Sequence, residues 1–171
     1  MALGNRVPHA VPIQDPIPSS WAWLELQGGR LDLAEAISTS GTVDVVALLV
    51  PLRAPEGGPV RVLVETRAPR HLELFRQLHF GPDNEDEKAA FLQAHREALL
   101  VAGPVQGLRL RGFIARSNAA KLRALAQEGG LELHPEAFIL VAGGSPARLR
   151  AGFFLLVALA GLLKVLRMGR R

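Results

Sequence analysis

Apolar residues in the first half of the chain recur at spacings that predict strands. Trp21 to Leu26 alternates between apolar and polar positions and predicts a first strand. Residues 42–50 are almost continuously apolar toward their end, which is typical of a central strand covered on both faces. Residues 60–66 alternate again after a loop rich in Gly and Pro. We therefore expect residues 43–66 to form an antiparallel pair.

Other segments have the spacing of helices. Leu31 to Ile37 predicts a short helix or helical turn, and Arg70 to Phe80 predicts a longer helix. Residues 85–101 predict another, which begins with three acidic residues that the positive end of a helix dipole stabilises. A further helix is expected from Ser117 or Asn118 through residue 127.

Two more strands are expected in the second half of the chain. Residues 105–115 alternate, and we expect Leu108 to point inward and Arg109 outward. Residues 131–134 and 137–141 predict final strand pieces, kinked at Pro135. The expected fold class is α+β: a small antiparallel or mixed sheet with 3–4 helices, followed by a single C-terminal transmembrane helix.

This pattern divides the 171 residues into three parts. Residues 1–20 form a proline-rich extended leader, either mobile or draped over the domain, and residues 21–144 form the α+β domain. Residues 145–171 form a membrane helix with a basic tail. We expect no secretory signal within residues 1–20, because four prolines interrupt any apolar stretch there.

The proposed membrane helix centres on residues 151–163, which carry no charge. Ser145 is a good N-cap, and Pro146 suits the first helical position. A helix from Pro146 to Met168 extends about 34 Å, enough to cross a hydrocarbon core of about 30 Å. The side chains expected to lie in the bilayer are Phe153, Phe154, Leu155, Leu156, Val157, Leu159, Leu162 and Leu163.

A buried core helix and an interfacial or re-entrant helix remain alternatives, since the uncharged stretch is short. The transmembrane interpretation is favoured because this stretch is apolar around its whole circumference. Basic side chains on both flanks can also extend to the two interfaces. They are Arg148, Arg150, Lys164, Arg167, Arg170 and Arg171. Two precede the stretch and four follow it, a bias that leaves either side of the membrane open for the domain.

The net charge of +4 suggests nucleic-acid binding, but its distribution argues against that class. Six of the 20 Lys and Arg residues lie in residues 148–171, which leaves 14 against all 16 Asp and Glu in the first 147 residues. A domain with this balance has no overall positive field to attract phosphates, so we expect no nucleic-acid partner.

Candidate chemistry is sparse. The chain has no Cys, which excludes disulfides and thiolate metal sites. Its five His residues lack the spacing of metal ligands, and no serine lies in a nucleophile motif. We therefore expect no catalytic residue, no metal and no cofactor.

Three segments resemble surfeit-locus-type cytochrome oxidase assembly proteins: residues 50–64, residues 131–135 and the terminal apolar helix. The Arg-Gly-Trp that follows the second strand of that family is replaced here by Glu65-Thr66-Arg67. Residues 151–163 also contain neither the His nor the Trp of the family's final membrane helix. The resemblance implies a membrane-bound assembly role, and no residue role is carried over from it.

Together these features favour a non-enzymatic membrane-anchored accessory, assembly or scaffold protein. Its expected partners are the lipid bilayer and other membrane-protein subunits of a larger complex. One alternative is a membrane-bound enzyme acting at the bilayer surface, with His134, Glu136 and Arg148 at the junction. The other is a soluble domain whose C-terminal helix completes its own core or forms an oligomer interface.

Overall fold

The computed structural model describes residues 7–40, 44–110, 120–121 and 123–144. The strands are β1 (His9–Pro12), β2 (Trp23–Gln27), β3 (Arg30–Asp32), β4 (Ile37–Ser38), β5 (Leu48–Arg53), β6 (Val60–Thr66), β7 (Leu100–Ala102), β8 (Val105–Arg109) and β9 (Leu133–Ala142). The helices are α1 (Pro69–Phe80), α2 (Glu85–Ala94) and α3 (Arg96–Leu99), and residues 123–128 are also helical. This combination of a mixed sheet and helices confirms the α+β class.

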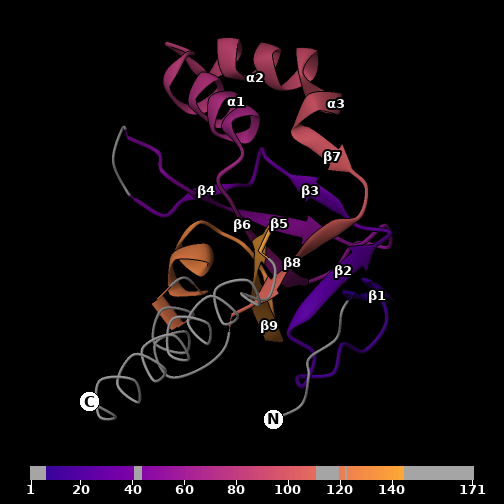
Figure 1. The fold of residues 1–171 in the computed structure, drawn as a ribbon. Helices are drawn as coiled ribbons and strands as arrows, with labels where there is room; N and C mark the ends of the chain where they lie inside the picture. Colours follow the sequence, from indigo (N-terminus) through magenta and orange to yellow (C-terminus); the bar gives the residue numbers. More distant parts are fainter. Residues whose placement is uncertain (1–6, 41–43, 111–119, 122, 145–171) are drawn as a thin grey trace, which may run out of the picture.

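The described strands form one mixed sheet that curls on itself (Figure 1). Its order is β1-β2-β8-β9-β6-β5-β3-β7, with β4 paired to β5. The pairs β1–β2 and β6–β9 are parallel, and the others are antiparallel. Only Gly28 and Gly29 separate β2 from β3, so one bent strand pairs with β8 at its start and with β5 at its end. This bent strand joins the two sides of the curl.

Alternate strand residues fill the inside of the curled sheet. Leu24 and Leu26 of β2, Val50 of β5 and Leu140 of β9 have no measurable exposure there. Fully burying each such side chain stabilises the fold by about 1.5–3 kcal/mol. Val50 lies opposite Val64 in the β5–β6 ladder, which confirms the predicted antiparallel pair.

A second, smaller apolar cluster lies on the outside of the same strands. Leu49 of β5, Leu63 of β6 and Ile139 of β9 pack there against Ala126 from the helical residues 123–128 and against Leu131. The central strands are therefore covered on both faces, as the nearly continuous apolar sequence of residues 42–50 predicts.

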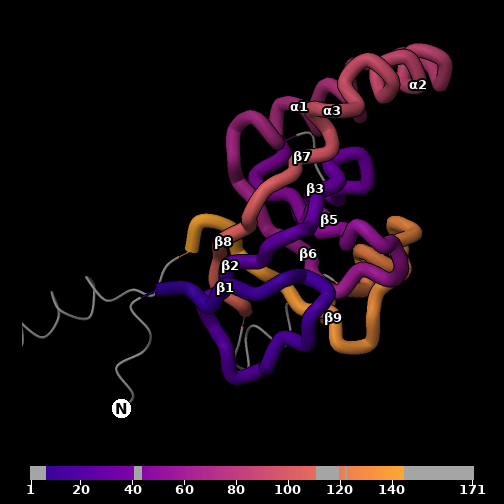
Figure 2. Tube along the Cα trace, turned by 90° about the vertical axis from the view of Figure 1, so that its right-hand side faces the viewer, coloured from indigo at the N-terminus to yellow at the C-terminus, as the bar shows by residue number. Residues whose placement is uncertain are grey.

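The helices α1 to α3 follow β6 as one excursion. α1 begins with Pro69 at its first position and buries Phe75 and Leu78 in the main core. Asn84 caps α2 by accepting a hydrogen bond from the Glu87 backbone N–H at 2.8 Å. No residue of α2 is fully buried, and α2 projects from the body of the molecule (Figure 2).

Two helix predictions are wrong in part. The expected helix over residues 85–101 ends at Ala94, since His95 leaves the helical conformation, and α3 then gives way to β7. Residues 100–102 form a strand and not the end of a helix, because they pair with β3. The expected helix over residues 31–37 is instead the end of β3, a turn and β4, because both strands pair with β5.

Two strand predictions also need correction. Leu133–Ala142 is a single strand through Pro135, although its register against β6 shifts beside that proline. On β8 the expected faces are inverted: Arg109 lies over the ring of Phe138, which belongs to the inner cluster, and Leu108 lies on the outer face. Within the leader, residues 9–12 form β1 and pair with β2.

Candidate functional site

All the side chains predicted to lie in the bilayer, and all the flanking basic residues, belong to residues 148–171 and lie outside the described residues. No described helix has the length and apolar character needed to cross a membrane. The candidate site is therefore the described surface from which residues 145–171 depart.

Both termini of the described chain lie on one side of the sheet. His9 of β1 is opposite Leu24, Leu24 is opposite Gly107, and Gly107 is opposite Ala142. Three strand spacings of about 4.8 Å place His9 about 14 Å from Ala142. The start of β1 and the end of β9 lie on the same side in Figure 2, with α2 on the opposite side. We call this surface the exit side and define it by His9, Leu24, Gly107 and Ala142.

The chain turns sharply at the exit side. The Gly144 N–H donates to the carbonyl of Val141 at 3.3 Å, and Gly143 has a φ of 69°, a value that favours glycine. The Gly143 N–H also donates to the carbonyl of Gln106 at 3.0 Å. A Cβ on Gly144 would lie 3.2 Å from the side chain of Leu108. Gly144 therefore lies against the outer face of β8.

That outer face carries a row of apolar side chains. Trp23 is opposite Leu108, and Leu108 is opposite Val141. Their neighbours Leu24 and Leu140 belong to the inner cluster, so these three point outward. We call Trp23, Leu108 and Val141 the outer row. It continues to Glu65 of β6, which pairs with Arg67 at 3.1 Å.

Aromatic and cationic side chains hold the loop between β1 and β2. The ring of His9 stacks on Trp21 with centroids 4.3 Å apart and planes within 2°. The guanidinium of Arg109 lies 4.0 Å from the centroid of Phe138 and donates to the carbonyl of Pro18 at 3.2 Å. The stack joins Trp21 to β1, and the hydrogen bond joins Pro18 to β8. Together they attach residues 18–21 to the sheet.

The polar residues expected at a membrane junction lie far from the exit side. His134 and Glu136 lie near the start of β9, and the Glu136 N–H donates to Nδ1 of His134 at 3.1 Å. Eight residues of strand separate His134 from Ala142, or about 26 Å at about 3.3 Å per residue. Arg148, the third residue of that hypothesis, lies outside the described residues.

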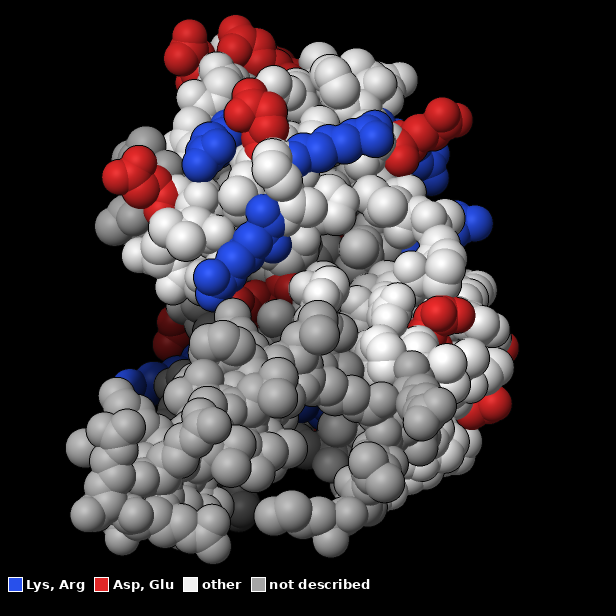
Figure 3. Space-filling model, viewed as in Figure 1, with Lys and Arg blue, Asp and Glu red and all other residues white. Residues whose placement is uncertain are grey.

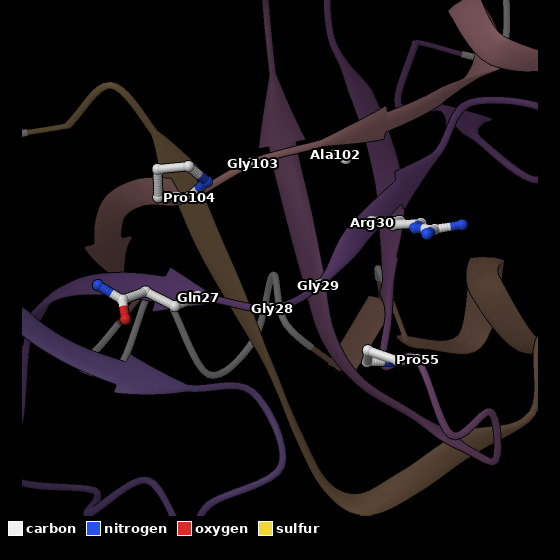
Figure 4. A pocket seen from close by; sticks show the side chains of 8 residues that line it. All are labelled: Gln27, Gly28, Gly29, Arg30, Pro55, Ala102, Gly103 and Pro104. Carbon is white, nitrogen blue, oxygen red and sulfur yellow. The ribbon is translucent and has the colours of Figure 1, made fainter.

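A hollow of about 480 Å³ opens where the bent strand β2–β3 passes β7–β8. It is lined mainly by backbone, from Gly28, Gly29 and Gly103, with Gln27 and Arg30 on its rim. Figure 4 shows these two polar side chains pointing in opposite directions. Binding sites usually have a few polar groups that converge on the ligand. Gln27 and Arg30 do not converge on this hollow, so we do not assign it as the candidate site.

A second cleft lies between β3 and the helices α2 and α3, where Leu92, Leu99 and Arg96 face Asp32. Burial, and secondarily the nearby Glu35, raise the pKa of Asp32 above its ordinary value. Asp32 Oδ1 accepts the Ala34 N–H at 3.1 Å, which fixes the turn after β3. This geometry gives Asp32 a structural role at the cleft.

The described residues contain no group of three or more His, Asp or Glu side chains arranged to hold a metal ion. Sequence alternation alone assigns Leu108 to the inner face, so it does not predict the outer row. No protein-family model, curated protein or solved structure matches the chain.

Proposed function

We propose that the protein is a membrane-anchored accessory, assembly or scaffold protein, held to the bilayer by residues 151–163 and docked on a larger membrane complex. The observation that carries the proposal is this uncharged apolar stretch, which is flanked by basic residues and begins a few residues after β9. A helix over residues 146–168 matches the thickness of a bilayer. The lipid bilayer and other membrane-protein subunits are the proposed partners.

The arrangement of the described domain supports this proposal. The exit side lies at the end of β9, so an anchor that starts there holds the domain close to the bilayer. The projecting α2 lies on the other side of the molecule, with Glu85, Asp86 and Glu87 in its first turn (Figure 2). Acidic side chains gather at the top of the molecule in Figure 3. This places α2 where a subunit of a complex could reach it.

The charge distribution supports a protein partner over a nucleic acid. The 14 basic and 16 acidic side chains of the first 147 residues give the domain no excess of positive charge. Phosphate backbones are bound by a concentrated positive surface, which this balance does not supply.

Membrane extraction tests the anchor. We expect the full chain to remain with membranes in alkaline carbonate and to require detergent for release. Replacing Leu156 and Leu159 with Lys should release it, because each Lys near the centre of a bilayer costs about 3 kcal/mol relative to Leu. The matched control, Leu156→Ile with Leu159→Val, should stay membrane-bound. Release of the unmodified chain without detergent would select the soluble alternative.

Partner content tests the accessory role. Solubilisation of the full chain in mild detergent should bring other membrane-protein subunits in constant stoichiometry. Recovery of the chain alone at its natural abundance would contradict the proposal. The anchor and the role are thus tested separately, since a chain can be membrane-bound and still lack partners.

A further inference from the structure

The outer row is apolar, yet it belongs to neither of the two clusters of the described residues. Trp23, Leu108 and Val141 are half-buried, and the helical residues 123–128 cover Leu49, Leu63 and Ile139 instead. A half-buried apolar row on the outside of a sheet is a candidate contact surface.

The indole nitrogen of Trp23 points to the same conclusion. Trp23 Nε1 is buried, and the described residues offer it no hydrogen-bond acceptor. A buried N–H without a partner costs about 1–3 kcal/mol, and buried Trp N–H groups usually have an acceptor. An acceptor from outside the described residues, either another part of the chain or water, would remove this cost.

The path of the chain identifies what can supply it. Both edges of β9 are already paired, one with β8 and the other with β6, so the chain beyond β9 cannot add to either edge of this strand. The turn at Gly143 and Gly144 reverses the chain, and Gly144 already lies against Leu108. Trp23 is one strand spacing farther, about 4.8 Å. Gly144, the last described residue, therefore lies at one end of the outer row.

We propose that residues 145–150 of this chain pack on the outer row and supply the acceptor for the Trp23 indole N–H. The row spans about 10 Å, and six residues extend about 9 Å as a helix or about 20 Å when extended, so the segment is long enough. Leu149 supplies an apolar side chain, and the Ser145 hydroxyl supplies an acceptor. The carboxylate of Glu65, 17% exposed, borders the row and complements the segment's two arginines.

This contact goes beyond the proposed function, because it forms whether or not residues 151–163 enter a bilayer. It leaves residues 151–168, about 27 Å long as a helix, to cross the bilayer. Its consequence for an anchored protein is orientation. A segment packed along the sheet holds the domain at one angle to the residues that follow, whereas a free tether would let it rotate. The outer row is then an internal contact of the chain and is closed to other proteins.

Fluorescence of the full chain tests the contact. The chain has two Trp, no Tyr and no Cys, so Trp21→Phe leaves Trp23 as the main emitter, and a single added Cys can carry a nitroxide quencher. With the label at Leu149→Cys, in phosphatidylcholine vesicles, we expect loss of most of the Trp23 emission. The matched control, Asp86→Cys on α2, should leave the emission unchanged. Equal emission from the two labelled chains would overturn the proposal.

A second pair of variants covers the case in which the label itself disturbs the contact. Leu108→Cys with Leu149→Cys should form an intramolecular disulfide on mild oxidation, because such a bond requires Cα atoms within about 7 Å. Leu108→Cys with Asp86→Cys should not. Brominated phosphatidylcholine provides the opposing outcome, since strong quenching of Trp23 by these lipids would show that lipid covers the outer row. If the chain fails the carbonate test but forms the disulfide, the anchor is wrong and this inference stands.

Discussion

Replacing Gly107 with Ala tests how the exit side is held together. Gly107 lies in β8 opposite Ala142 of β9. A Cβ at this position would overlap the carbonyl oxygen of Val141 and would lie 2.9 Å from Cγ of Leu140. Because the first of these atoms belongs to the backbone of the neighbouring strand, a side-chain rotation cannot relieve the overlap. The two strands must separate locally, and the turn that places Gly144 must move with them.

The magnitude follows from three contributions. Overpacking in a closely packed region costs about 1–3 kcal/mol. Each ladder hydrogen bond that weakens adds about 0.5–1.5 kcal/mol. Replacing Gly with Ala in a strand returns about 0.5–1 kcal/mol, because Ala loses less backbone entropy on folding. With one ladder hydrogen bond weakened and the middle of each range taken, we expect a net loss of about 2 kcal/mol in the free energy of unfolding, a large fraction of the 5–15 kcal/mol typical of a folded domain.

Urea unfolding of the full chain in mild detergent, followed by circular dichroism, measures this loss. At about 2 kcal/mol per molar urea, the midpoint should fall by about 1 M. Gln106→Ala is the matched control, since Gln106 is exposed and uses its backbone carbonyl, which the substitution keeps, to accept the Gly143 N–H. If Gly107→Ala unfolds at the same urea concentration as the control, the close approach of β8 and β9 does not determine stability, and the reasoning is refuted.

Three further predictions concern the edges of the fold. Arg61→Leu removes the hydrogen bonds from Nη1 to the carbonyls of residues 13–15, at 3.1–3.5 Å. Amide hydrogen exchange should therefore accelerate in residues 9–15 and stay unchanged in β6, and an equal change in both segments would contradict this prediction. Asp32→Asn keeps the acceptor for the turn but removes a buried charge. It should raise stability at neutral pH, with the gain vanishing below pH 3.8, because the raised pKa of Asp32 makes its ionisation unfavourable in the folded state. Burial lowers the pKa values of His71 and His79, so stability should fall as pH drops below 6.5, and urea midpoints of a His71→Gln, His79→Gln chain should fall less.

The hairpin β5–β6 and the helix α1 could be predicted from local pattern. Apolar and polar residues alternate along Val60–Thr66, and a Gly-rich loop precedes this strand. Pro69, which suits a first helical position, is the first residue of α1. These signals are contained within about ten residues, and their partners are adjacent in sequence. The β5–β6 ladder joins residues separated only by one loop, so sequence proximity and spatial proximity agree.

Pairing with strands distant in the sequence determines the secondary structure of the segments that local pattern predicted wrongly or did not predict. Residues 31–37 and 100–102 have apolar spacing that a helix could use, but they form strands because β3 lies between β5 and β7. Residues 9–12 are flanked by prolines, yet they pair in parallel with β2. Parallel pairing leaves no turn signal in the sequence, since its two strands are joined by a longer connection. Tertiary pairing thus overrode local preference at each of these positions.

The candidate site was missed for a related reason. Alternation on a strand shows that its two faces differ, but it does not show which face is covered. The assignment of Leu108 to the inside assumed that the outside of the sheet meets water. In the structure Arg109 lies on the inner face, with its guanidinium over the ring of Phe138, and Leu108 lies on the outer face beside Gly144.

The outward apolar residues divide according to what lies over them. Leu49, Leu63 and Ile139 point outward, and the helical residues 123–128 with Leu131 cover them. Trp23, Leu108 and Val141 point outward in the same sheet, a short distance from the last described residue. If an apolar outer position requires a cover, as the first set indicates, then the second set requires one too. Residues 145–150, which follow Gly144 in the sequence, are the cover proposed above. The apolar character of Leu108, which led to its assignment to the inner face, is thus explained by the proposal that residues 145–150 pack against it.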